Sequence, residues 1–382
     1  MTHTPPHTLP VAVDDPVNAK ILAVSEDRIA GFHAAPFRTI AEQSGVALDT
    51  VLERIRAMLE AGVIRRVRQT VLANKLAPGA LVAWQVPADK LDAAFDYMAQ
   101  RDPFSGHVVI RSADPATPGA QYKLWTTLKV PQGFSMHRHC ELLMRLTGAT
   151  AYRLMPAEKL FSLGVGHVRR RKLEPGSKSD EPGAVHDTEV LELSQDEWRV
   201  LAALKDELAP EEIQPEPWRK RAADAGIDYD LFLRVAQQLN DRGIIGRFST
   251  FLEHVKKVAG SDRVTRFNAL FHWQVPEGRE IEAGKEVGRF HVMTHAYWRE
   301  GGPEFRHVNI MGVAHGLEKE MVLAHKQAID AHLESVGIPV GYTNVFWGGR
   351  SEIKPSEILP QRYIAWCESV GVDPESMRND GD

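Results

Sequence analysis

The 382-residue chain carries the same order of motifs twice, which limits its fold to two copies of one module. Pro36-Phe37-Arg38 and Pro217-Trp218-Arg219 begin two stretches that stay in register, without a gap, at an offset of 181 residues. Two later pairs follow at offsets of 189 and 188 residues, namely residues 82–87 with 271–276 and residues 107–111 with 295–299. A near-constant offset over three separate motifs indicates a tandem duplication.

Each copy begins with a predicted helix-turn-helix. In the first copy, apolar residues at helical spacing predict a helix over residues 16–31, then a short helix at 37–43 and a longer one at 48–61. Gly45 supplies the turn between the last two helices, and residues 63–72 fit a β-wing. The second copy repeats this pattern after residue 191.

The remainder of each copy predicts a ferredoxin-like domain, because residues 81–156 and again 268–347 show the order β-α-β-β-α-β. The predicted fold class is therefore α+β, a tandem duplication of a winged helix-turn-helix plus a ferredoxin-like domain. Along the chain this predicts a flexible arm (1–15), helix-turn-helix domain 1 (16–75), ferredoxin-like domain 1 (76–171), a linker (172–190), helix-turn-helix domain 2 (191–255), ferredoxin-like domain 2 (256–350) and a C-terminal tail (351–382).

Composition points to a cytoplasmic protein. The net charge of −5 gives no overall attraction to nucleic acid or to acidic lipid. Only two cysteines occur, which suits a reducing compartment. The first residues lack the features of a secretory signal, and no apolar run is long enough to span a bilayer, so no membrane partner is expected.

The second helix of each helix-turn-helix lacks the charge of a DNA-reading helix. Residues 48–61 hold three acidic side chains and two arginines, and residues 228–241 hold three acidic side chains and one arginine. Such a helix must present cations to phosphates. We therefore predict that DNA is not a partner, and we interpret the motif as a packing or dimerisation module.

One strand of the second copy carries a candidate site. His295, Tyr297 and Arg299 alternate along it, so the two-residue period of a strand places all three on one sheet face. They combine an imidazole that titrates near neutrality, a phenol and a cation that matches carboxylates. His315 ends the adjacent predicted strand. The alternative interpretation is a polar, exposed sheet face without a ligand.

The first copy repeats part of this pattern, with His107 and Arg111 but with Val109 in place of the tyrosine. Further cations lie on the predicted wings, where Arg65 and Arg66 in the first copy and Arg247 in the second are candidates for gripping an anionic ligand. A basic edge that only faces solvent remains the alternative.

A metal site is not expected. His137 and His139 precede Cys140, but side chains two apart on a helix face different directions. No second pair of ligands has metal-finger spacing.

Taken together, these motifs resemble the siroheme decarboxylase family, Lrp/AsnC-like proteins of the haem d1 and alternative haem pathways, in its fused two-copy form. The resemblance covers about residues 16–172 and 190–350. It rests on the paired motifs above and on a further set: Gly-Val-Ile-Arg-Arg at 62–66, Gly-Ile-Ile-Gly-Arg-Phe at 243–248, Trp-x-Val-Pro at 84–87 and 273–276, Tyr-Lys-Leu-Trp-Thr-Thr at 122–127, residues 154–161, and the segment 308–316 that ends in His-Gly.

The resemblance implies the non-oxidative removal of two acetate carboxylates from siroheme, giving didecarboxysiroheme, a carboxy-lyase reaction. By motif position, His295, Tyr297, Arg299 and His315 would be catalytic, and His107 and Arg111 would bind substrate together with the wing arginines Arg65, Arg66 and Arg247. The implied partner is a tetrapyrrole, with no cofactor beyond the substrate's own iron. The fused copies would form an internal pseudo-dimer, and a further homodimer is left open. The competing hypotheses are a DNA-binding Lrp/AsnC-type regulator and a tetrapyrrole-binding protein without catalysis.

Overall fold

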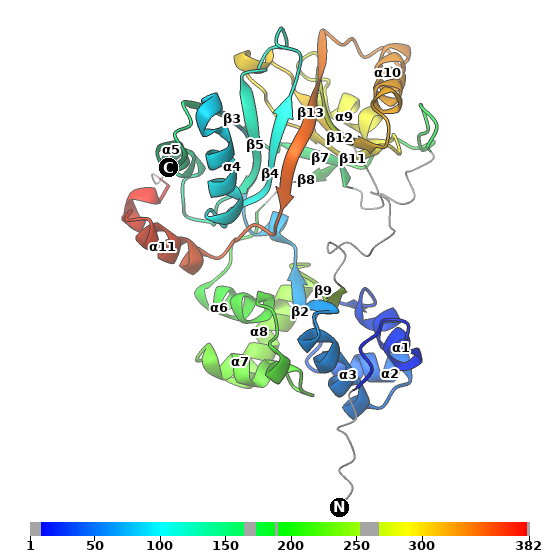
Figure 1. Cartoon of the computed structure of the whole chain (residues 1–382), viewed down its shortest axis with the longest axis vertical. Helices are drawn as coiled ribbons and strands as arrows, with labels where there is room; N and C mark the ends of the chain where they lie inside the picture. The colour runs from blue at the N-terminus through cyan, green and yellow to red at the C-terminus, as the bar shows by residue number, and fades with distance from the viewer. Residues whose placement is uncertain (1–8, 164–172, 188–189, 253–266, 380–382) are drawn as a thin grey trace, which may run out of the picture. The chain divides into compact units, whose positions relative to one another are not determined.

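A computed structural model describes residues 9–163, 173–187, 190–252 and 267–379, and these form two compact units (Figure 1). The first unit contains Met1–Ala73 and Leu191–Ser261, and the second contains Asn74–Val190 and Asp262–Asp382. The corresponding segments of the two copies therefore pack together. One unit contains both helix-turn-helix segments, and the other contains both ferredoxin-like segments.

The first unit is built from two similar sets of helices and a small sheet. The first copy supplies α1 (Pro16–Ser25), β1 (Ile29–Ala30), α2 (Pro36–Ser44), α3 (Leu48–Glu60) and β2 (Ile64–Val71). The second copy supplies α6 (Gln195–Lys205), the 3-10 turn η3 (Pro210–Glu212), α7 (Trp218–Asp224), α8 (Tyr229–Asp241) and β9 (Ile245–Leu252). The turn after α2 needs the left-handed backbone of Gly45, and the equivalent turn after α7 uses Gly226 in the same way.

The two copies share one three-stranded antiparallel sheet in the order β1-β9-β2. The aromatic residues of the duplicated motif pack on this sheet. Phe37 of α2 and Trp218 of α7 both make edge contacts with Phe248 of β9, with ring centroids 5.4 and 6.0 Å apart. The predicted wings are thus strands of a common core.

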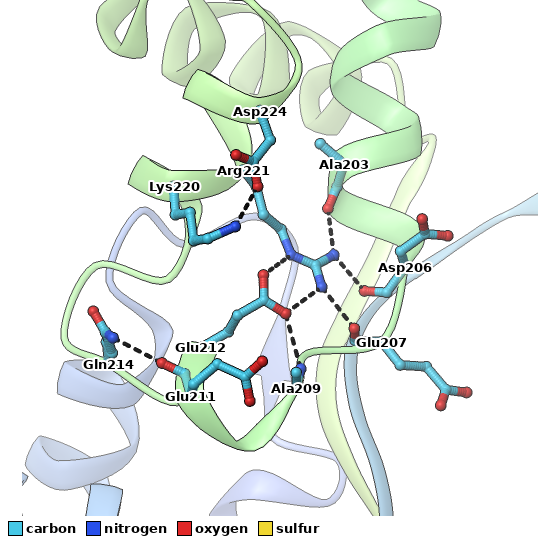
Figure 2. Close-up of polar contacts among 10 residues, drawn as sticks. All are labelled: Ala203, Asp206, Glu207, Ala209, Glu211, Glu212, Gln214, Lys220, Arg221 and Asp224. Carbon is cyan, nitrogen blue, oxygen red and sulfur yellow. Dashed lines mark hydrogen bonds and ion pairs between the residues drawn. The ribbon is translucent and has the colours of Figure 1, made fainter.

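A buried arginine fixes the second copy's helices. Figure 2 shows Arg221 of α7 donating to both carboxylate oxygens of Glu212, each at 2.8 Å. It also donates to the carbonyl oxygens of Ala203, Asp206 and Glu207 at 2.8, 2.7 and 2.6 Å. Since these groups end α6 and begin η3, this cation holds α6 and α7 together and is satisfied within the unit.

The second unit is a ten-stranded sheet with helices on one face. Its first-copy elements are β3 (Gly79–Gln85), α4 (Leu91–Gln100), β4 (Ser105–Ser112), β5 (Tyr122–Lys129), α5 (Met136–Thr147), β6 (Ala151–Pro156), β7 (Lys159–Leu163) and β8 (His186–Asp187). Its second-copy elements are β10 (Phe267–Gln274), α9 (Glu280–Gly288), β11 (Met293–Trp298), β12 (Ile310–Gly316), α10 (Lys319–Ser335), β13 (Tyr342–Ile353) and α11 (Pro360–Ser369). The strand order is β6-β3-β5-β4-β13-β10-β12-β11-β7-β8.

Each copy sends its last strand across to the other copy. The first part of β13 pairs with β10, and its continuation from Trp347 to Ile353 pairs with β4 of the first copy. In return, β7 of the first copy pairs with β11 of the second. Figure 1 shows β13 (orange) running beside β4. This exchange covers strand edges that would otherwise be open, and makes one sheet of two ferredoxin-like domains.

The two faces of the sheet bury different partners. On one face, α4, α5 and α11 cover the first copy's strands, and α9 and α10 cover the second copy's strands. On the other face, which we call the inner face, apolar residues of both copies form a shared cluster that includes Val109, Trp125, Leu270, Met311 and Phe346. The two copies thus have a common core on the side opposite these five helices.

The structure corrects the prediction for both ends of the chain. The segment 351–382, predicted as a tail, begins inside β13 and continues into α11, whose Tyr363 and Trp366 belong to the first copy's core. In the predicted arm, residues 9–15 are held by Asn18, which donates to the carbonyls of Pro10 and Ala12. Residues 1–8 lie outside the described part.

Part of the predicted linker also forms β-pairs with neighbouring segments. His186 and Asp187 form β8 alongside β7, and Lys178 bridges to Phe290 of the second copy. No helix in the described ranges is both long and apolar enough to cross a bilayer.

Candidate functional site

The inner face carries a band of polar and cationic side chains beside its apolar cluster. Strand alternation places His107 and Arg111 on the same side of β4 as Val109, and it places Asn268 on the same side of β10 as Leu270. His315 shares the face of Met311 on β12, and Lys129 shares the face of Trp125 on β5. The predicted residues of both copies therefore lie on one continuous surface.

The motif on β11 has the geometry that its spacing predicts. The rings of His295 and Tyr297 are nearly parallel, 11° apart, with centroids 6.0 Å apart. The guanidinium of Arg299, just after the strand, lies 4.4 Å from the centroid of the Tyr297 ring. Arg299 is 7% exposed and donates to the carbonyl of Met155 in the first copy at 2.6 Å. Burial also raises the pKa of Tyr297.

A hydrogen-bonded chain links the two copies through Asn268. Arg111 donates to Asn268 Oδ1 at 3.0 Å, and Asn268 Nδ2 lies 2.9 Å from His315 Nε2. Because the arginine can only donate, the amide oxygen accepts and the amide nitrogen must donate. His315 Nε2 is then the acceptor, which holds His315 as the neutral tautomer with its proton on Nδ1.

Thr294 continues this chain to His295. Its hydroxyl donates to the carbonyl of Val313 at 2.9 Å, so its oxygen can accept. His295 Nδ1 lies 3.2 Å from this oxygen, and His315 Nδ1 lies 3.5 Å from it. His295 therefore carries a proton on Nδ1, and its Nε2 is the atom that can take up and release another.

Burial lowers the pKa values of the basic side chains on this face. It lowers the pKa of His107 to about 4, assisted by the charges of Arg111 and His295. It lowers the pKa of Arg111 to about 10, and burial together with Arg299 lowers that of Lys129 to about 8. Burial also lowers the pKa of Arg299, opposed by Tyr297. Among the described residues, no carboxylate contributes to these four shifts.

Several buried nitrogens on this face also lack partners, and two of them belong to predicted site residues. His107 Nε2 and Arg111 Nε have no hydrogen bond within the described part of the chain. A buried polar atom without a partner costs free energy, about 1–3 kcal/mol. Cations without counter-charges, next to an unsatisfied guanidinium nitrogen of Arg111, form a site suited to an anionic ligand.

Lys129 is a site residue that the sequence analysis missed. Trp84 and Trp273 are equivalent, and counting along β3 and β10 makes Gly79 equivalent to Asn268. Gly79 pairs with Lys129, as Asn268 pairs with His315. Lys129 is thus the first copy's counterpart of His315, a relation that only the strand register reveals. A Cβ at Gly79 would lie 3.1 Å from Lys129 Nζ, so the glycine leaves room for the lysine.

The predicted wing arginines belong to the other unit. Arg65 and Arg66 lie on β2, and Arg247 lies on β9. Arg66 donates to Glu207 at 3.3 Å, and the guanidinium groups of Arg66 and Arg247 lie 5.5 and 6.0 Å from the Phe251 ring. Their role in binding substrate stays a prediction.

The first copy's candidate DNA-reading helix, α3, uses both of its arginines internally. Arg54 donates to the carbonyl of Pro10 at 3.0 Å, and Arg56 donates to the carbonyls of Pro210 and Ile213 at 3.2 and 2.7 Å. A cation engaged in this way cannot contact phosphate without breaking bonds within the fold.

The first unit also contains a cavity of about 670 Å³, whose lining includes three cations and three carboxylates: Arg38, Arg219, Lys220, Glu211, Glu212 and Glu216. Arg219 pairs with Glu216, and Lys220 pairs with Asp224. The charges in this cavity are therefore largely matched, unlike those of the inner face.

The histidines of α5 are used within the fold. His139 is fully buried, with Nδ1 3.0 Å from the Tyr363 hydroxyl and Nε2 3.5 Å from Asp102, and His137 contacts the Tyr152 hydroxyl. No group of three potential metal ligands occurs among the described residues.

Comparisons with known proteins agree on one group of relatives. Residues 77–162 match the AsnC-like ligand binding domain, and residues 32–65 match the siroheme decarboxylase NirDL-like HTH domain. A siroheme decarboxylase of Hydrogenobacter thermophilus is 25% identical over 292 residues, which cover 75% of this chain and 80% of that protein. The siroheme decarboxylase beta subunit of Methanosarcina barkeri is 26% identical over 149 residues, covering 38% of this chain and 95% of that subunit.

The fold has a solved counterpart. The crystal structure of the siroheme decarboxylase NirDL, in complex with an iron-uroporphyrin III analogue, superposes with a TM-score of 0.64. It is 18% identical in sequence, and the superposition covers 93% of this chain and 98% of that one. This match confirms the predicted fold class. Together with the sequence relatives, it confirms the resemblance of this chain to the siroheme decarboxylase family.

Proposed function

We propose that this chain is a siroheme decarboxylase, a carboxy-lyase that removes two acetate carboxylates from siroheme without oxidation and gives didecarboxysiroheme. The observation that carries the proposal is the inner face, where buried cations from both copies gather without carboxylate partners. The names of the relatives point to the same substrate. A tetrapyrrole with many carboxylates supplies the charges that this face lacks.

In this proposal, Arg111 and Arg299 bind the carboxylates of the substrate. Arg111 and Arg299 are 5% and 7% exposed, so a carboxylate that reaches them is largely removed from water. Charge-assisted hydrogen bonds in such a setting are stronger than those between neutral groups. The bond of Arg111 to Asn268 and that of Arg299 to Met155 O hold each guanidinium in place before the substrate arrives.

The chemistry needs a proton at one carbon. When the bond between the acetate methylene and its carboxylate breaks, carbon dioxide leaves and the electron pair stays on the methylene carbon. His295 is suited to supply the proton that completes the methyl group, because an imidazole titrates near neutral pH and Thr294 orients this ring through Nδ1. Tyr297 stacks on His295 and Arg299, and so limits the movement of both.

The iron of this reaction belongs to the substrate, and no other cofactor is part of the proposal. A histidine that binds iron must be neutral. The lowered pKa of His107 keeps this imidazole neutral at pH 7, and its Nε2 has no hydrogen-bond partner in the described part of the chain. We therefore assign the iron to His107.

The proposal is tested by anaerobic incubation of the purified chain with siroheme, followed by mass spectrometry and the Soret spectrum. We expect a product that has lost two molecules of carbon dioxide. In His295→Gln the rate should fall by about 100-fold or more, the usual contribution of a general acid. The control is His291→Gln, because His291 is exposed and contacts Ser177 away from the inner face.

Three other results would contradict the proposal. Binding with an unchanged siroheme mass would indicate a tetrapyrrole-binding protein without catalysis. Neither binding nor a change in mass, together with salt-dependent retardation of DNA, would indicate a regulator. Equal rates for the two histidine variants would remove His295 from the site.

A further inference from the structure

The inner face contains two half-sites that are related by the duplication. We define the second-copy half-site as His295, His315 and Asn268 with Arg111 of the first copy. We define the first-copy half-site as His107 and Lys129 with Arg299 of the second copy. In each, the arginine comes from the opposite copy, as the contacts of Arg111 with Asn268 and of Arg299 with Met155 O show.

The strand register makes this equivalence specific. In the first copy, Gly79 and Lys129 occupy the positions that Asn268 and His315 occupy in the second. In the same way, His107 and Arg111 correspond to His295 and Arg299. An unpaired buried charge is costly. If the first-copy half-site had only a structural role, we would therefore expect it to carry no such charge. Lys129 instead remains partly buried on the inner face, with Nζ 3.3 Å from the carbonyl of Ala77.

We propose that each half-site removes one of the two carboxylates, and that Lys129 is the proton donor of the first-copy half-site. This rests on the proposed function. In the first-copy half-site, the bond between methylene and carboxylate breaks, and carbon dioxide leaves. The electron pair stays on the methylene carbon, and the Lys129 ammonium gives it the proton that forms the methyl group. Solvent then returns a proton to the amine, so no oxidant or reductant is needed.

The chemistry of the two candidates agrees with this assignment. In the proposed function His107 holds the iron of the substrate, which leaves Lys129 as the proton donor of this half-site. Lys129 has a pKa of about 8, so at pH 7 it is protonated, yet it releases its proton more readily than an ordinary lysine. Because the positive charge of Arg299 contributes to this shift, a bound carboxylate that neutralises Arg299 would partly reverse it.

The test is a single-turnover time course with the full-length chain and siroheme, in which mass spectrometry separates the unreacted, singly decarboxylated and doubly decarboxylated species. Lys129→Met should accumulate the singly decarboxylated species, with one of the two losses slowed by about 100-fold or more. Lys123→Met is the matched control, because Lys123 is an exposed lysine of the same strand. It should behave as the wild-type chain does.

A second variant distinguishes the loss of the transferable proton from the loss of the positive charge at this position. Lys129→Arg keeps the cation but cannot release a proton near neutral pH, so it should stall at the same species as Lys129→Met. In the wild-type chain, the rate of the step that stalls in Lys129→Met should fall as the pH rises through about 8, the pKa of Lys129.

Two outcomes overturn the inference while leaving the proposed function intact. One is a wild-type rate of both losses in Lys129→Met, and the other is an equal slowing of both losses. Full activity of Lys129→Arg would assign Lys129 to binding alone and would also contradict it. If the wild-type chain and Lys123→Met both leave the siroheme mass unchanged, the proposed function itself has failed.

Discussion

Among the single residues of the inner face, the proposed function depends on which atoms donate hydrogen bonds and which accept them. The spacing of His295, Tyr297 and Arg299 was enough to predict that they share a face, because alternation along a strand is a local property. Asn268 and Lys129 could not be found in this way. Asparagine and lysine are common on strands, and these two matter only because the register sets them beside Arg111, His315 and Arg299.

Asn268 offers a test at this scale. Replacement by leucine removes the acceptor for Arg111 and the donor for His315, so both lose their fixed positions. A hydrogen bond to a charged group is worth about 1.5–3 kcal/mol, so kcat/KM for siroheme should fall by about 10- to 100-fold. The measurement is steady-state decarboxylation with circular dichroism as a check of folding.

The variant Asn268→Asp serves as its comparison. An aspartate accepts from Arg111 but cannot donate to His315 Nε2, so His315 should gain a proton there and titrate at higher pH. We expect the pH profile of kcat/KM to move upward in Asn268→Asp. Wild-type kcat/KM in Asn268→Leu would contradict the role given to this amide.

At the scale of elements, local patterns predicted helices and strands well where tertiary contacts did not override them. The segment 48–61 becomes α3, and the segment 280–288 becomes α9. Strand β12 begins only at Ile310, because Arg306 and His307 adopt a left-handed backbone, with φ of 57° and 54°, after the 3-10 turn η4 (Pro303–Phe305). Two successive residues of this kind are incompatible with a strand.

The C-terminal helix α11 is the element that the sequence analysis misjudged most. It lies beyond the part of the chain that the family resemblance covers, which ends near residue 350. In the structure Tyr363 is fully buried between Phe104 and Phe134, with ring centroids 4.8 and 4.4 Å apart, and its hydroxyl contacts His139. The helix completes the first copy's core.

This packing predicts a large loss of stability when the ring is removed. Tyr363→Ala should lower the free energy of unfolding by about 3–5 kcal/mol, the usual cost of deleting a large buried side chain. Chemical denaturation of the full-length chain measures it, and Gln361→Ala, at an exposed position of the same helix, is the control. A change of less than about 1 kcal/mol in Tyr363→Ala would show that α11 contributes little to the core.

At the scale of the whole molecule, the duplication is the feature that the sequence revealed best. It predicted two copies and both domain types, but not that like domains would join or that β7 and β13 would cross between copies. Such pairing is set by which strand edges remain open once each domain has formed, and no local pattern encodes it. The duplication matters for function because it brings Arg111 and Arg299, from different copies, to one surface.

The most direct test of the central claim is an anaerobic reaction of the wild-type chain with siroheme in deuterium oxide, with the product analysed by mass spectrometry. The account predicts the loss of two carboxylates as carbon dioxide and the gain of one deuterium in each new methyl group, because exchangeable side-chain protons complete both. Siroheme that binds but keeps both carboxylates, or a product whose new methyl groups contain no deuterium, would contradict it.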